Sequence, residues 1–135
     1  MSQTLVPRRW AHRFGRTRKD GLVDDPAVYA ARALVLRDLQ STSVVDAVVV
    51  SLLEEAVTTR RWWAAQWPDG IEYVAGLVAQ DVQDALLERV GRWPLCSICN
   101  SAEPHAVYIH PELGGPDPVW VCEQSGTTIA PLGSL

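Results

Sequence analysis

The three cysteines of this chain, Cys96, Cys99 and Cys122, all lie in its last third. Two residues separate Cys96 from Cys99, the spacing of a knuckle whose two thiolates can point at one centre. A third thiolate and one imidazole would complete a tetrahedral zinc site. This feature constrains the fold most, because a structural zinc ion supplies about 10 kcal/mol of folding free energy to a segment with little apolar core.

Two histidines compete for the fourth ligand position. His105 stands at the entrance of a short β-prone run, residues 106–109, and is nearer in sequence to the knuckle. His110 stands at the far end of that run, and alternation along a strand places the two imidazoles on opposite faces. We expect His105 to complete the set, with His110, water, another residue or no metal as the alternatives. His12 lies in a basic segment and is expected to be solvated.

The segment after the knuckle reads as short strands separated by turn residues. Glycines and prolines cluster between the runs, as they do in turns. Knuckle, hairpin and strand are the parts of a zinc ribbon. The sequence therefore predicts a zinc-ribbon-like β module over residues 92–135, with strands over residues 106–109, 119–122 and 127–130.

Upstream, apolar residues recur at spacings of three and four, the period of an amphipathic α-helix. Asp25-Pro26, Ser43 with Asp46 and Asp69 with Glu72 are helix-start patterns, and Gly91 is a C-terminal stop. We expect three helices, over residues 26–40, 44–67 and 71–90.

These elements predict an α+β fold. An N-terminal three-helix region, residues 25–91, is followed by the small C-terminal zinc-ribbon-like β module. Residues 91–94 separate the two, so we expect each to have a core of its own.

Charge is distributed unevenly along the chain. Residues 1–19 contain six bases and no acid, whereas the remainder has 6 bases and 16 acids, a balance of −10. Such a segment is either a solvated tail or an arm that binds an acidic partner. Because aromatic side chains are interleaved with the bases, we expect a basic arm, residues 1–24, flexible when free, that contacts a partner through Arg8, Arg9, Trp10, Arg13, Phe14 and Arg16.

A tryptophan cluster marks the end of the second expected helix. Trp63 and Trp67 are four residues apart and share a helix face, whereas Trp62 points elsewhere. Core packing with one amphipathic rim residue explains all three. The alternative is an exposed aromatic patch that anchors a partner, and we place Trp62 in it.

The C-terminal pattern also resembles a known group of sequences. Its parts are Trp93-Pro94-x-Cys96-x-x-Cys99, Pro104-His105, Val119-Trp120-Val121-Cys122 and an ending from Gly126 to Leu135. It is similar to small uncharacterised actinobacterial and actinophage proteins. In many of these proteins a histidine stands at the position of Cys99. Histidine and cysteine both bind zinc, so the resemblance implies that Cys99 is a zinc ligand. The resemblance covers residues 93–135 and implies no biochemical activity.

Catalytic readings of this tail find little support. His110-Pro111-Glu112 matches half of a zinc deaminase motif, but the order relative to the Cys-x-x-Cys half is reversed and the α/β core is missing. A redox dithiol would need a thioredoxin-like setting. Four candidate ligands close the coordination sphere, as in structural zinc sites. We therefore expect a non-enzyme without a small-molecule substrate.

Two binding functions remain as expectations. The first is a zinc-stabilised protein-interaction or structural-assembly module, an adaptor or a component of a larger, phage-derived complex, with a protein partner or a homo-oligomer. The alternative is a nucleic-acid-binding regulator that uses the arm and the ribbon. The acidic body and the lack of Lys or Arg after Arg92 argue against the second. No apolar run is long enough to span a membrane, so we expect a cytoplasmic or assembly-bound protein.

Overall fold

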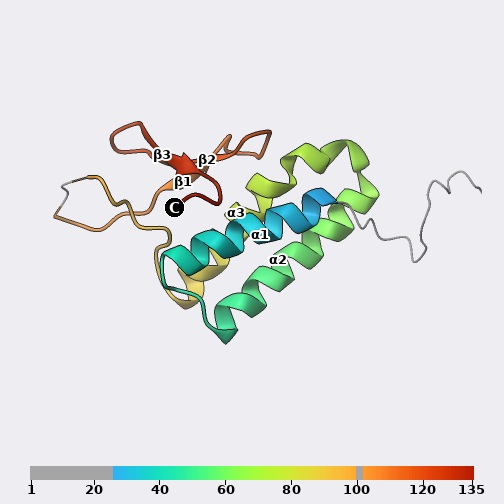
Figure 1. The fold of residues 1–135 in the computed structure, drawn as a ribbon, viewed down its shortest axis with the longest axis horizontal. Coiled ribbons are helices and arrows are strands. Elements are labelled where there is room, and N and C mark those ends of the chain that lie inside the picture. The colour runs from blue at the N-terminus through green and yellow to red at the C-terminus, as the bar shows by residue number, and fades with distance from the viewer. Residues whose placement is uncertain (1–25, 100–101) are drawn as a thin grey trace, which may run out of the picture.

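The computed structural model describes residues 26–99 and 102–135. Its helical part consists of α1 (Pro26–Ser41), α2 (Ala47–Gln66), the 3₁₀ helix η1 (Pro68–Tyr73) and α3 (Val74–Arg89). The strands that follow are β1 (Tyr108–His110), β2 (Val119–Cys122) and β3 (Thr127–Pro131). Three α-helices thus precede a small antiparallel sheet, which confirms the predicted α+β class (Figure 1).

Helix α2 starts at a different residue from the one predicted. The Asp46 carboxylate accepts a 2.8 Å hydrogen bond from the backbone N–H of Val49, and the Asp46 backbone is extended, with φ −152°. Ser43 has φ +61°, a left-handed conformation that does not suit an N-cap residue. The predicted start at residue 44 is therefore wrong, and Asp46 takes the capping role assigned to Ser43.

Helix α3 also begins later than predicted, at Val74. No side-chain cap precedes it, so the expected Asp69–Glu72 capping pair does not start this helix. The chain instead makes the tighter turns of η1 around Gly70. A Cβ atom at Gly70 would lie 2.5 Å from the Trp67 ring, so only glycine lets the backbone pass beneath that side chain.

The end of α3 is the glycine stop that the sequence predicts. The backbone N–H groups of Val90 and Gly91 both donate to the Leu86 carbonyl, at 2.7 and 2.8 Å. Gly91 has φ +137°, which ends the helix and turns the chain toward the knuckle.

The sheet has the order β1-β2-β3, with both pairs antiparallel. Tyr108 pairs with Val121, which in turn pairs with Thr128. The first strand lies later than the predicted 106–109, because Ala106 pairs instead with Leu95 in an isolated bridge. The second strand is the predicted 119–122, and the third extends one residue beyond the predicted 127–130.

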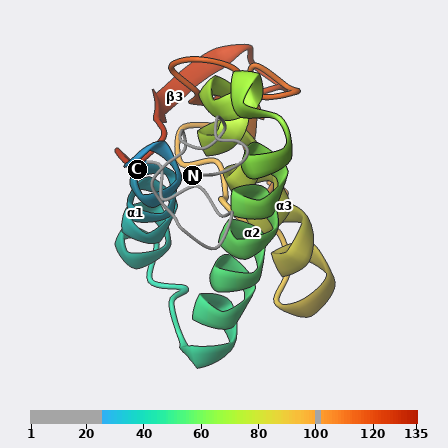
Figure 2. The same ribbon diagram turned by 90° about the vertical axis from the view of Figure 1, so that its right-hand side faces the viewer.

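Within residues 26–99 and 102–135, one buried core joins the helices and the sheet. The sheet lies on one side of the helices, over α1 and α3 (Figures 1 and 2). The expectation of a separate core for each part is therefore wrong. The buried cluster includes Val35, Leu39, Leu53, Val78, Val82 and Leu86 from the helices and Trp93, Val107, Ile109, Trp120, Cys122 and Leu132 from the C-terminal part.

One buried carboxylate fastens the sheet to α1. Asp38 is fully buried, and its oxygens accept hydrogen bonds from the Trp120 indole N–H at 2.8 Å and from the backbone N–H groups of Gly133 and Leu135 at 2.7 and 3.0 Å. A buried charge requires such hydrogen bonds. Asp38 thereby fixes both β2 and the segment after β3.

A second buried polar side chain fastens the knuckle. The Gln83 amide on α3 donates to the carbonyls of Trp93 and Val107, at 3.0 and 2.7 Å. The Trp93 indole N–H donates to the Thr42 hydroxyl at 2.8 Å, and its ring packs edge-on against Trp120, with centroids 5.5 Å apart. The two chain segments that flank the knuckle are thus held against the helices.

Candidate metal centre

Backbone pairing brings Cys96 and His105 together. The Cys96 N–H donates to the His105 carbonyl at 2.8 Å, and the Val107 N–H donates to the Pro94 carbonyl at 2.8 Å. The chain therefore doubles back after the knuckle and returns beside it. This short ladder places the imidazole next to the first cysteine before β1 begins.

Four side chains offer ligand atoms to one point. The sulfurs of Cys96, Cys99 and Cys122 and a ring nitrogen of His105 all lie within 4.8 Å of one another. Tetrahedral zinc with bonds of about 2.3 Å to sulfur separates two sulfur ligands by about 3.8 Å. The Cys99 and Cys122 sulfurs are 3.4 Å apart. Donor set and spacing both fit a tetrahedral metal ion, so these four residues could bind one.

His105, not His110, belongs to this cluster. The His105 Nε2 atom lies 3.5 Å from the Cys122 sulfur, while its Nδ1 atom lies 3.4 Å from the Glu103 carbonyl. Metal-binding histidines commonly donate their second ring N–H to such a carbonyl. The His110 Nε2 atom lies instead 3.1 Å from a carboxylate oxygen of Glu123.

Interactions within the cluster change the proton affinities of its members. Hydrogen bonds from the Ser125 hydroxyl and backbone N–H lower the pKa of Cys122 to about 5. The neighbouring Cys122 raises the pKa of Cys99 to about 11 and also raises that of His105. The backbone N–H of Ile98 lowers the pKa of Cys96. Thiolates this close repel one another, and a bound dication would stabilise all three.

Ser125 is a supporting residue that sequence reasoning missed. Cys122 and Ser125 have the same spacing as Cys96 and Cys99, so the serine occupies the second position of a second knuckle. The Gly126 N–H donates to the Cys122 carbonyl at 2.7 Å, which closes the turn. The sequence signal that could have identified Ser125 is the pattern Cys-x-x-Ser-Gly, which matches the spacing of the knuckle. Ser125 hydrogen-bonds the Cys122 sulfur, and His105 offers the fourth candidate ligand atom.

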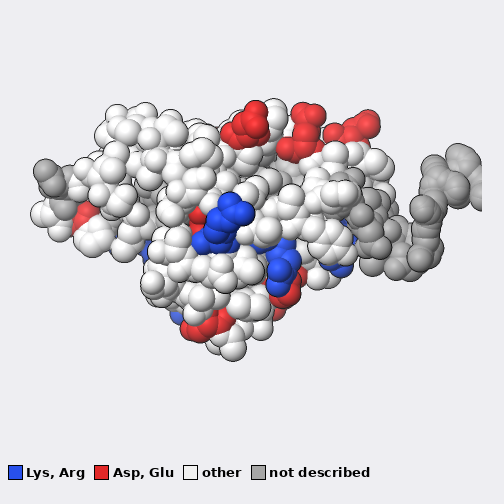
Figure 3. All heavy atoms as spheres, in the orientation of Figure 1, with Lys and Arg blue, Asp and Glu red and all other residues white. Residues whose placement is uncertain are grey.

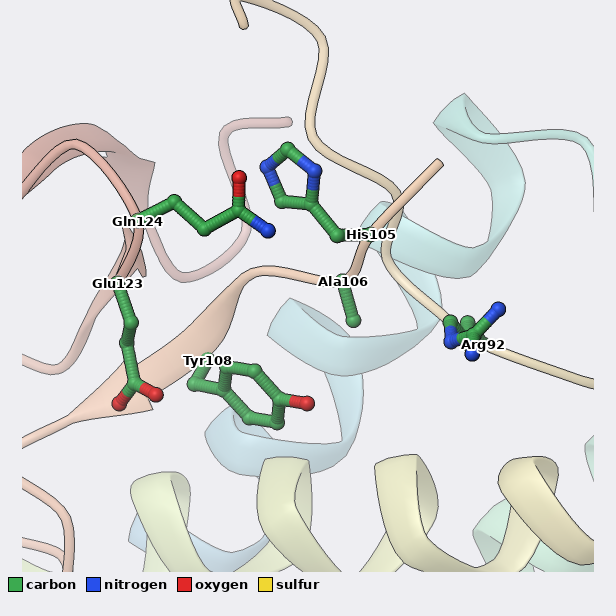
Figure 4. Close-up of a pocket in the computed structure, with 6 residues that line it drawn as sticks. All are labelled: Arg92, His105, Ala106, Tyr108, Glu123 and Gln124. Atoms are coloured by element: carbon green, nitrogen blue, oxygen red, sulfur yellow. The ribbon is translucent and has the colours of Figure 1, made fainter. Parts of the chain in front are cut away.

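A shallow hollow of about 260 Å³ adjoins the cluster (Figure 4). The His105 ring and the Gln124 side chain lie on one side of it, and the Tyr108 ring lies on another. Arg92 and Glu123 also line it. The hollow leaves His105, and with it one edge of the cluster, open to small solutes.

Aromatic side chains gather where α2 meets η1. Trp63 packs edge-on against Trp67, with centroids 5.2 Å apart, and Trp67 stacks on Tyr73 at 6.0 Å. Trp62 is 59% exposed and Trp67 is 48% exposed. The separate orientation predicted for Trp62 is confirmed by its exposure beside the half-buried Trp63. This end of α2 therefore presents aromatic surface to solvent.

The other predicted partner-binding residues lie outside the described stretches. These are Arg8, Arg9, Trp10, Arg13, Phe14 and Arg16. Asp25, predicted to cap the first helix, also lies outside the described residues. On the face in Figure 3, acidic side chains gather along the edge formed by η1 and the β1–β2 hairpin, and basic ones lie over the helices. None of the helices in residues 26–99 is long and apolar enough to cross a membrane.

Comparison with known proteins places the chain in a family without assigning an activity. No curated protein and no solved structure matches it. A family model described as a domain of unknown function (DUF8819) matches residues 24–132, which include all three helices, the knuckle and the sheet. The chain therefore belongs to the DUF8819 family.

Proposed function

We propose that this protein is a non-enzymatic module for protein interaction or structural assembly, stabilised by one zinc ion. The observation that supports it best is the convergence of Cys96, Cys99, His105 and Cys122 within 4.8 Å. Thiolate and imidazole are the ligands that zinc prefers in structural sites. Zinc there would fix the knuckle to the end of β2.

The ligand number favours a structural over a catalytic zinc ion. Catalytic zinc usually has three protein ligands and keeps one position for water or substrate. Here four protein ligands would fill the tetrahedron. The hollow is lined by His105, one of the four proposed metal ligands, and does not provide a free coordination position on the metal. The proposal therefore takes zinc as a part of the scaffold, with no small-molecule substrate.

Exposed aromatic side chains on α1 and α2 suggest which surface binds the partner. Trp62 and Tyr29 are 59% and 49% exposed, and the Arg61 guanidinium lies 5.4 Å from the Tyr29 ring centre. Tryptophan, tyrosine and arginine are enriched among residues that dominate binding energy at interfaces. We propose a protein partner or a second copy of this chain, contacted by this surface and by the basic arm of residues 1–24. The resemblance of residues 93–135 to small actinobacterial and actinophage proteins supports extending the proposal to a phage-derived assembly.

Native mass spectrometry of the full chain tests the assembly role. We expect complexes heavier than one chain that disappear when residues 1–19 are removed and weaken in Trp62→Ala. Leu113→Ala is a matched control, because Leu113 is an exposed apolar residue in the β1–β2 connection, away from α2. A monomer without co-purifying protein, unchanged by removal of the arm, would contradict the proposal.

Nucleic-acid binding is the alternative, and the six bases of residues 1–19 favour it. Phosphate contacts make binding steeply dependent on salt. Titration of the full chain with unrelated DNA fragments at several salt concentrations distinguishes the two functions. Sub-micromolar DNA binding at physiological salt that is lost with residues 1–19 would support the alternative. No binding under these conditions agrees with an arm that contacts protein.

A further inference from the structure

The geometry points to a modification site within the cluster: hydroperoxides join Cys99 and Cys122 in a disulfide, and this reaction releases the metal. The release of zinc rests on the proposed metal site. The disulfide itself requires only the two cysteines. Their sulfurs lie 3.4 Å apart although the residues are far apart in sequence. A disulfide bond of about 2.05 Å needs the sulfurs to approach by roughly 1.4 Å.

The surroundings favour a disulfide between Cys99 and Cys122 over one between Cys96 and Cys99. The backbone of Cys96 is held by its 2.8 Å hydrogen bond to His105 and by the adjoining bridge between Leu95 and Ala106. Cys99 is half-buried, as Cys96 is, whereas Cys122 is buried, so a small oxidant approaches the cluster from the side of the knuckle. Cys122 is fully buried at the end of β2 and is placed to attack the Cys99 sulfur from within the protein.

The reaction balances with a hydroperoxide as oxidant. The Cys99 thiol first loses its proton to solvent, and its sulfur then attacks the peroxide oxygen. The O–O bond breaks, a sulfenic acid forms, and the departing hydroxide or alkoxide takes up a solvent proton and leaves as water or an alcohol. The Cys122 thiolate then attacks the Cys99 sulfur and expels hydroxide, which a solvent proton converts to water. The two sulfurs lose two electrons and the peroxide gains them. Cys96 and His105 remain, and two ligands are too few to retain zinc firmly.

The fold lets this change occur without loss of the core. Asp38 holds Trp120 in the middle of β2, and Gln83 holds the carbonyls of Trp93 and Val107. None of these hydrogen bonds involves a metal ligand. Oxidation therefore frees the knuckle from its metal while the sheet stays on the helices. The cross-link replaces one of the connections that the metal provided.

Treatment of the full-length, zinc-loaded protein with hydrogen peroxide tests the inference. We expect free thiols to fall from three to one, with one equivalent of zinc appearing in a colorimetric chelator. Digestion after glutamate separates Cys122 from Cys96 and Cys99, because Glu103 and Glu112 lie between them. Mass spectrometry should then find the fragment with Cys122 joined to the knuckle fragment. Far-ultraviolet circular dichroism should remain unchanged.

A matched variant identifies which knuckle cysteine reacts. In Cys96→Ser, which lacks one proposed metal ligand and whose fold is verified by circular dichroism, the same cross-link should still form. A Cys96–Cys99 disulfide, or sulfinic acid without a disulfide, would overturn the inference. The metal content measured before oxidation tests the zinc site separately. Protein without zinc that still forms the Cys99–Cys122 bond would contradict the proposed metal role alone.

Discussion

The Trp120 indole N–H donates to the buried Asp38 carboxylate across 2.8 Å, and this bond joins the middle strand of the sheet to α1. The two residues are 82 positions apart in sequence. Hydrogen bonds to a charged acceptor contribute more than those between neutral groups. A sheet this small therefore has a firm attachment that does not depend on a metal. The metal cluster is built onto that attachment.

Replacement of Asp38 should destabilise the whole fold. Asp38→Ala leaves the N–H groups of Trp120, Gly133 and Leu135 buried without their acceptor. Each unsatisfied buried group costs about 1–3 kcal/mol, so we expect a loss of roughly 3 kcal/mol or more in the free energy of unfolding. Urea denaturation followed by tryptophan fluorescence measures it.

The control for that experiment is Asp84→Ala. Asp84 is an exposed acid on α3, and its replacement should change stability by less than about 0.5 kcal/mol. If both variants lost the same small amount, the Asp38 hydrogen bonds would not fasten the sheet.

Ser125 should affect metal affinity rather than global stability. Its hydroxyl and N–H hydrogen-bond the Cys122 thiolate and lower the pKa of that group. Loss of an outer hydrogen bond to a metal ligand typically weakens binding by about 10–100-fold. We expect Ser125→Ala to weaken zinc binding within this range in competition with a chromogenic chelator. Ser134→Ala, at an exposed serine beyond β3, is the control and should bind zinc as the wild type does.

The local parts of the fold could be predicted from the sequence, and the long-range parts could not. Cys-x-x-Cys, the strand that ends at Cys122 and the stop at Gly91 depend on neighbouring residues, and the structure confirms them. Asp38 is different. Its polar side chain lies within the buried apolar stripe of α1. Its hydrogen-bond partners are more than 80 residues away in the sequence, so no local pattern identifies them.

The wrong helix starts have a similar explanation. Ser43 and Asp46 both suit an N-cap, and only the backbone conformation shows which of them takes that role. At Gly70 the ring of Trp67 requires a tighter turn than the sequence indicates. The expectation of two cores was wrong because Trp93 and Trp120 pack together against the helices.

The surface ion pair between Arg32 and Glu54 predicts a small effect of pH. The Arg32 guanidinium lowers the pKa of Glu54, so the pair stabilises the fold above the ordinary pKa of glutamate and loses this contribution as pH falls through the lowered value. Because Glu54 is exposed and Arg32 is only half-buried, we expect Glu54→Gln to cost less than about 1 kcal/mol at pH 7. Denaturation at pH 7 and pH 3 should show the difference disappearing in acid. A larger deficit at pH 3 would contradict this assignment.

Metal removal should loosen the knuckle more than the sheet. After chelation we expect faster hydrogen exchange in residues 95–99 and 102–106. These segments contain Cys96, Cys99 and His105, the three candidate ligands that lie outside the strands. Strand β2 should keep its protection, because Trp120 remains bonded to Asp38 and packed in the core. Equal loss of protection in α1, β2 and the knuckle would show that the metal holds the entire fold together.

Native mass spectrometry of the full chain, purified without added metal, tests the zinc site most directly. We expect one zinc ion per chain in the wild type and in His110→Ala, because His110 pairs with Glu123 away from the cluster. Cys96→Ser, Cys99→Ser, His105→Ala and Cys122→Ser should each lose most of the bound zinc. A folded wild-type protein without zinc, or one in which His110→Ala loses the ion while His105→Ala retains it, would contradict the assignment.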